Sequence, residues 1–91
     1  MAITLTKKVT STYANPRPNP GDSDSPYEIV APYIAEQVSL GKTDGQIDVL
    51  DTYTSVRLWA DQASAQDFAD FIVATMTGLG RSDLTNTITD I

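Results

Sequence analysis

The sequence contains no cysteine and no histidine. Without cysteine there is no disulfide, no thiolate metal site and no cysteine nucleophile. Without histidine the commonest general base and the commonest metal ligand are missing. We therefore predict no catalytic residue, no cofactor and no metal ion, and we expect the protein not to be an enzyme.

Long apolar runs are also lacking. No stretch approaches the about 20 residues that cross a membrane, and the first ten residues lack the apolar segment of a signal peptide. We expect no membrane partner.

Basic residues are few. The chain has six lysines and arginines and twelve aspartates and glutamates, which gives a net charge of −6. Only Lys7 and Lys8 are adjacent, whereas binding to nucleic acid needs clustered cations. The acidic residues are spread evenly and do not form the dense rows of a nucleic-acid mimic. We therefore expect no nucleic-acid partner, and we interpret the acidic surface as a source of solubility.

The chain is short, with 91 residues of which 41% are apolar. This length predicts a single domain over residues 1–91 with a thin core. Domains of this size often gain stability from a partner or from copies of themselves.

Proline is concentrated in one segment. Four of the five prolines lie in ANPRPNPGDSDSPYE, residues 14–28. Pro16, Pro18 and Pro20 favour an extended, stiff backbone, so we expect residues 14–25 to form an extended arm that reaches a partner or wraps over the domain's own sheet. Arg17 and Tyr27, the only large side chains of residues 14–28, are the expected contacts.

Alternation of apolar and polar residues predicts the strands. Residues 3–13 form a half-buried strand whose apolar face is interrupted by Lys7, which suggests a sheet edge. Residues 46–61 form either one long bent strand or two strands folded around residues 51–55. The threonine-rich tail, residues 82–91, is a weak last strand that pairs within the chain or with another chain.

Two helices are predicted. The first covers about residues 32–40, with the part before Pro32 irregular or kinked, because proline removes a helical hydrogen bond. Ser25 and Glu28 have capping-box spacing just upstream. The second helix covers residues 64–80, with Ser64 as its cap and an apolar stripe at helical spacing.

The order of elements predicts an α+β domain. We expect a mostly antiparallel sheet of three or four strands with two helices on one face, in a ferredoxin-like arrangement with the extended proline-rich arm added. Three short patterns resemble parts of binding or catalytic sites but have simpler interpretations. GKT at residues 41–43 lacks the rest of a phosphate-binding loop, Asp22, Asp24 and Glu28 lack the spacing of a calcium loop, and Asp67 and Asp70 follow the polar side of the second helix.

Residues 43–72, TDGQIDVLDTYTSVRLWADQASAQDFADFI, resemble the C-terminal half of small tailed-bacteriophage proteins. In those proteins a strand ending in an Arg-x-Trp pair is followed by an alanine-rich helix, as Arg57, Trp59 and Phe68 are arranged here. The same succession is similar to dimeric α/β-barrel domains of ferredoxin-like fold. The resemblance implies a minor virion component, located in the virion or, during assembly, in the host cytoplasm.

These observations favour a non-enzymatic structural or interaction protein, a capsid, neck or tail accessory that contacts copies of itself or a major virion protein. The alternatives are a protein-binding inhibitor or antitoxin-like module, and a dimeric α/β-barrel-type enzyme with a pocket between sheet and helices near Tyr33, Tyr53 and Trp59. The predicted partner-binding residues are Arg17, Pro18, Pro20, Tyr27 and Trp59.

Overall fold

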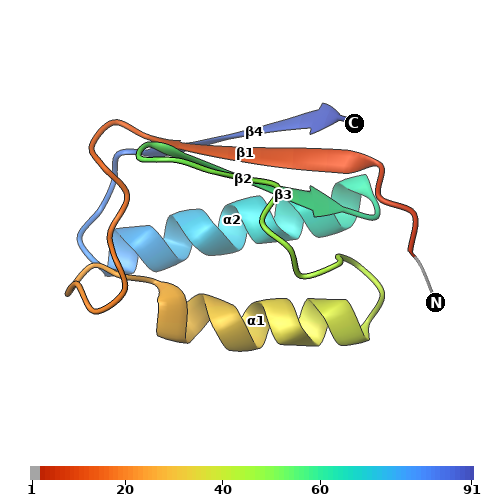
Figure 1. The fold of residues 1–91 in the computed structure, drawn as a ribbon, viewed down its shortest axis with the longest axis horizontal. Helices are drawn as coiled ribbons and strands as arrows, with labels where there is room; N and C mark the ends of the chain where they lie inside the picture. Colours follow the sequence, from red (N-terminus) through yellow and green to blue (C-terminus); the bar gives the residue numbers. More distant parts are fainter. Residues whose placement is uncertain (1–2) are drawn as a thin grey trace.

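The computed structural model describes residues 3–91, in which two helices cover one face of a four-stranded sheet (Figure 1). The elements follow the order β1 (Lys7–Tyr13), α1 (Tyr27–Ser39), β2 (Val49–Leu50), β3 (Thr54–Trp59), α2 (Gln62–Gly78) and β4 (Leu84–Asp90). The strand order is β2-β3-β1-β4, and all pairs are antiparallel. This topology confirms the predicted ferredoxin-like α+β fold.

The strands confirm most of the sequence predictions. Residues 46–61 hold two strands, because the Asp51 carboxylate accepts hydrogen bonds from the backbone N–H groups of Tyr53 and Thr54 and turns the chain between them. The tail pairs within the chain, with β4 beside β1 over its whole length. The edge position suggested by Lys7 is wrong, since β1 is a central strand and Lys7 forms an ion pair with Asp90 of β4.

Helix α1 is longer than predicted. It begins at Tyr27, and Pro32 lies inside it. The missing proline N–H removes one hydrogen bond of the first turns, but Pro32 is exposed while Val30 and Ile34 on the opposite side are buried. We infer that burial of this apolar side outweighs the lost bond.

Helix α2 begins at Gln62, and its N-cap is Asp61 rather than the predicted Ser64. The Asp61 carboxylate accepts a hydrogen bond from the Ser64 backbone N–H at 2.8 Å. This bond lowers the pKa of the Asp61 carboxyl. Ser64 is itself buried in the first turn, on the side that packs against the sheet.

The core lies between the sheet and α2, and α1 joins it from the side. Trp59 of β3 is fully buried and stacks on Phe68 of α2 with ring centroids 4.9 Å apart. Tyr33 of α1 stacks on Phe71 of α2 at 4.0 Å. Helix α2 packs directly against β1, β3 and β4, and Figure 1 draws α1 farther from the strands.

The proline-rich segment does not project from the domain, so the predicted extended arm is not seen. Residues 14–25 cross one end of the sheet and lead into α1 (Figure 1). The Ala14 N–H donates to the Asp83 carbonyl at 3.2 Å, and the Arg17 N–H donates to the Thr52 carbonyl at 2.8 Å. These two bonds tie the segment to its own domain. The arrangement corresponds to the predicted alternative in which the segment wraps over the domain's own sheet.

Arg81 fastens this segment. Its guanidinium donates two hydrogen bonds to Asp83, one to Asp24, and one each to the carbonyl oxygens of Asn15 and Pro16. The Arg81 guanidinium and the Asn15 backbone N–H hold the pKa of the Asp83 carboxyl well below its usual range. We call these five residues the Arg81 clamp. The sequence analysis did not single out Arg81.

Candidate binding sites

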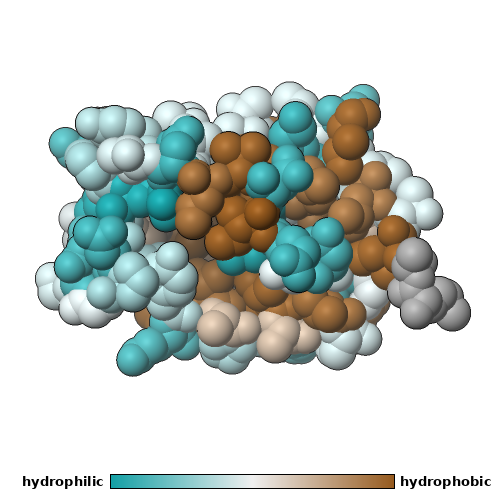
Figure 2. Space-filling view, viewed as in Figure 1, coloured by the Kyte–Doolittle hydropathy of each residue, from teal (hydrophilic) through white to brown (hydrophobic). Residues whose placement is uncertain are grey.

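A groove of about 540 Å³ lies between α1 and the sheet. Its walls are mainly apolar, and Figure 2 shows apolar residues gathered between α1 and the strands. The wall residues with large apolar side chains are Val30, Ile34, Val38, Ile47, Leu50, Phe68 and Ile72. This volume lies within the range of about 300–1,000 Å³ typical of small-molecule sites.

The groove exists because α1 stands away from the sheet and β2 is very short. β2 itself is only Val49 and Leu50, and Thr43 forms an isolated bridge with Trp59 of β3. The chain between these two pairings, from Gly45 onward, forms a rim of the groove. Gly45 has a φ of +78°, and a β-carbon there would lie 2.9 Å from Val38 of α1. A glycine at this position lets the rim approach the end of the helix without closing the groove.

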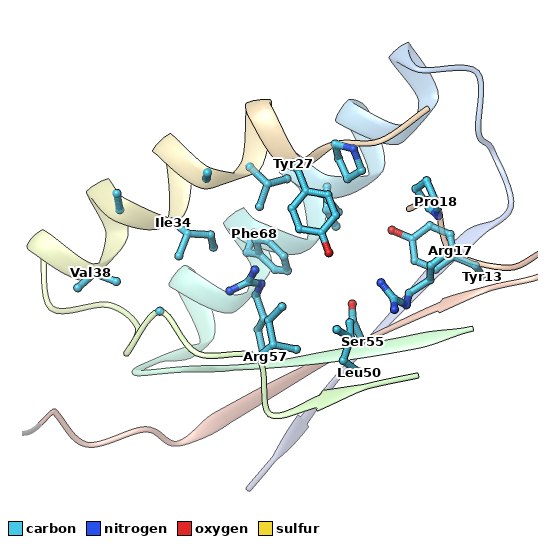
Figure 3. A pocket seen from close by; sticks show the side chains of 17 residues that line it. Tyr13, Arg17, Pro18, Tyr27, Ile34, Val38, Leu50, Ser55, Arg57 and Phe68 are labelled. Atoms are coloured by element: carbon cyan, nitrogen blue, oxygen red, sulfur yellow. The ribbon is translucent and has the colours of Figure 1, made fainter. Parts of the chain in front are cut away.

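One cation inside the groove has no anionic partner within residues 3–91. Arg57 of β3 points between the sheet and α1 (Figure 3), and its Nη1 atom is buried without a hydrogen-bond acceptor. Its guanidinium lies 6.0 Å from the centre of the Phe68 ring. Burial lowers the pKa of Arg57, and Tyr27 and Asp44 act in the opposite direction. Arginine nevertheless remains charged at neutral pH, so the groove contains an unpaired positive charge.

Other polar groups lie toward the proline-rich segment. Arg17, Tyr27 and Ser55 project into the same space (Figure 3). The Arg17 Nε donates to the Asp51 carbonyl. Tyr13 closes this end of the groove, and burial raises the pKa of its hydroxyl while Arg81 and Arg17 lower it. The groove therefore combines apolar walls with two guanidinium groups and two phenol rings.

Three of the five predicted partner-binding residues line the groove, namely Arg17, Pro18 and Tyr27. Pro20 is exposed and lies outside it, and Trp59 is fully buried in the core. The space between sheet and helices was expected near Tyr33, Tyr53 and Trp59, but its aromatic side chains are those of Tyr13, Tyr27 and Phe68. The sequence analysis noted Arg57 only as part of a resemblance and did not predict its place in a site.

The opposite face of the sheet is covered by neither helix. In β1 the side chains of Lys8, Thr10 and Thr12 alternate with the buried ones and therefore point away from the helices. Their direct partners and the β2 residue beside them complete this uncovered face: Val49, Thr54, Val56, Leu58, Thr85, Thr87 and Thr89. These ten paired positions thus carry six threonines, three aliphatic residues and one lysine, and none of the ten is acidic. Val56 is the buried member of the set.

Comparison of the chain with protein-family models, with curated protein sequences and with solved structures finds no match to any of them.

Residues of the GKT and DSD patterns have structural roles within the described part of the chain. Gly41, at a φ of +73°, follows the end of α1, and Thr43 donates a hydrogen bond to the Leu58 carbonyl at 2.8 Å. Asp24 belongs to the Arg81 clamp and Asp22 accepts a bond from the Asn19 N–H. Residues 3–91 hold no group of three potential metal-ligating side chains, and neither of their helices meets the length and apolarity of a membrane span.

Proposed function

We propose that this chain is a non-enzymatic structural protein that associates with a second copy of itself through the uncovered face of its sheet. One observation supports this most strongly. The chain has twelve acidic residues, yet the uncovered face has none among the ten side chains that the strand pairing assigns to it. Six of those ten are threonines.

Electrostatics makes this face the least unfavourable one for association with a copy of the chain. Two chains that each carry a net charge of −6 repel one another, and the repulsion is smallest where no carboxylate lies in the interface. Threonine and aliphatic side chains also lose less hydration energy on burial than charged ones do. A pair of small domains with thin cores gains stability from such an association.

The resemblance of residues 43–72 to small bacteriophage proteins supports a virion as the setting. Neighbouring subunits there would be copies of this chain or a major virion protein. The absence of histidine and cysteine supports a role that does not involve catalysis.

The test places a negative charge at the centre of the uncovered face. Thr10 lies between its direct partners Val56 and Thr87, so Thr10→Glu should place two carboxylates close together in the dimer. We expect the wild-type chain to be a dimer by size-exclusion chromatography with light scattering, and Thr10→Glu to be a monomer.

The matched control is Thr77→Glu, which adds the same charge at an exposed position of α2, on the helical side. It should remain a dimer. A wild-type chain that stays monomeric over the whole accessible concentration range, or a Thr10→Glu dimer of unchanged affinity, would contradict the proposal.

A further inference from the structure

We propose that the groove between α1 and the sheet binds a monocarboxylate with an elongated apolar body, such as a fatty acid, and that the carboxylate pairs with the Arg57 guanidinium. This site lies on the helical side of the sheet, opposite the uncovered face, and does not depend on self-association. The inference comes from the unpaired charge, the apolar walls and the shape of the groove.

The unpaired charge points to an anion. A buried N–H of a charged guanidinium without a hydrogen-bond acceptor is destabilising, because it loses hydration without a compensating hydrogen bond. Arg57 Nη1 is such a group, and no carboxylate of residues 3–91 forms an ion pair with Arg57. The planar guanidinium matches a carboxylate through two parallel hydrogen bonds. A bound carboxylate would therefore satisfy the group that the fold leaves unsatisfied.

The overall charge favours a single negative charge on the ligand. The chain has a net charge of −6, and each additional negative charge on a ligand increases the repulsion. Arg17 is the second cation at the groove, but its Nε already donates to the Asp51 carbonyl. A polyphosphate, which needs several cations or a loop of backbone N–H groups, is poorly matched here.

The walls point to an elongated apolar body. The groove runs along α1 from Pro26 to Val38, a distance of about 18 Å at 1.5 Å per residue. Ala31 and Ala35 are the small residues of that wall, and Ile47 and Leu50 form the opposite rim. An extended hydrocarbon chain would bury these side chains, which are partly exposed in the free protein.

The proline-rich segment forms one end of the site. Arg17 and Pro18 line it, and the Arg81 clamp holds the backbone just before them and the Asp24 side chain beyond them. Because this segment is already ordered, binding would not require the ordering of a flexible loop, which otherwise reduces affinity. This gives the stiff segment a role that does not involve a protein partner.

The experiment measures binding of dodecanoate and of dodecanol by isothermal titration calorimetry, below the concentration at which dodecanoate forms micelles. We expect the wild-type chain to bind the acid. Arg57→Met should weaken binding of the acid by about tenfold or more, as expected for loss of a charge-assisted hydrogen bond, and should leave binding of the alcohol nearly unchanged. Lys42→Met removes the same charge outside the groove and should not change either affinity.

A second pair of variants tests the walls. Ala35→Trp places a large side chain in the groove from an exposed helix position, and should abolish binding of both ligands. Ala63→Trp makes the same change at an exposed position of α2 that does not line the groove, and should bind as the wild type does.

Three results would overturn the inference. The first is absence of dodecanoate binding, and the second is an acid affinity that Arg57→Met does not reduce. The third is tighter binding of a short apolar peptide through its free C-terminal carboxylate than of dodecanoate, which would assign the groove to a protein terminus.

Discussion

The Arg81 clamp and the groove around Arg57 each contain one arginine in a partly buried position, but their surroundings differ. The Arg81 side chain is 14% exposed and uses its hydrogen-bond donors on two carboxylates and two carbonyl oxygens. Arg57 has a buried Nη1 without a partner and an apolar cavity beside it.

This difference separates a structural charge from a charge available for binding. In the clamp, every hydrogen bond of the guanidinium joins parts of the same fold, and their loss would loosen the proline-rich segment. In the groove, the Arg57 charge has the Phe68 ring nearby but no ion pair within the described residues, and its buried Nη1 has no acceptor. A ligand from outside the domain could supply that acceptor. The stability of variants at the two positions should therefore change in opposite directions.

The largest expected effect is on the clamp. Arg81→Ala removes five hydrogen bonds and leaves Asp83 and Asp24 without their partner. We expect the free energy of unfolding to fall by roughly 2–3 kcal/mol, as measured by urea denaturation. Hydrogen exchange at the backbone N–H groups of Asn15 and Arg17 should become faster, because the segment is no longer fastened.

Lys42→Met serves as the control for the lost charge and should change stability by less than about 0.5 kcal/mol. An Arg81→Ala protein as stable as the wild type, with unchanged exchange at residues 14–25, would show that the clamp does not hold the segment.

The next effect has the opposite sign. Arg57→Met keeps an unbranched side chain of similar length and removes the unpaired charge. We expect the free energy of unfolding of the ligand-free protein to rise by about 1 kcal/mol, since replacement of buried charges by apolar groups is often stabilising. Urea denaturation without added fatty acid measures this change. A loss of stability comparable to that of Arg81→Ala would mean that Arg57 has a structural role.

The sequence was sufficient to predict the order and arrangement of the helices and strands, but not the roles of Arg57 and Arg81. The alternation in residues 3–13 and the apolar stripe of residues 64–80 are local patterns, and they predicted β1 and α2 with small errors at the ends. The start of α1 was placed too late because the rule against proline is local, whereas burial of Val30 and Ile34 depends on the rest of the fold.

The sites depend on contacts that no local pattern contains. Arg17 and Tyr27 were chosen as the large side chains of a stretch of small ones, and both line the groove. Arg57 reaches it only because the fold brings β3 opposite α1, a helix that ends at Ser39, eighteen residues earlier in the sequence. The sequence offered one local indication for Arg81, the opposite charge of Asp83 two residues later. The bonds of Arg81 to Asn15 and Pro16 depend on the fold, which brings together residues far apart in the sequence.

The smallest expected effect concerns pH and again distinguishes the two regions. The pKa of Asp83 is lowered in the folded protein, first by its hydrogen bonds with Arg81 and then by the Asn15 backbone N–H. A carboxyl whose pKa is lower in the folded than in the unfolded state contributes stability above its unfolded value of about 3.9, and this contribution is lost as the pH falls toward the folded value.

Asp83→Asn should therefore be less stable than the wild type at about pH 7, and the difference should shrink as the pH falls to about 3 and below. Urea denaturation at both pH values measures it. Because the other carboxyls titrate alike in both proteins, the difference between them isolates Asp83. Arg57→Met should show a much smaller change in its offset from the wild type over the same pH range, because Arg57 forms no ion pair within residues 3–91 and Asp44 acts on it only without direct contact. An offset of Arg57→Met that changes in acid as much as that of Asp83→Asn would show that a carboxylate holds Arg57 in the free protein, and the contrast between the two arginines would fail.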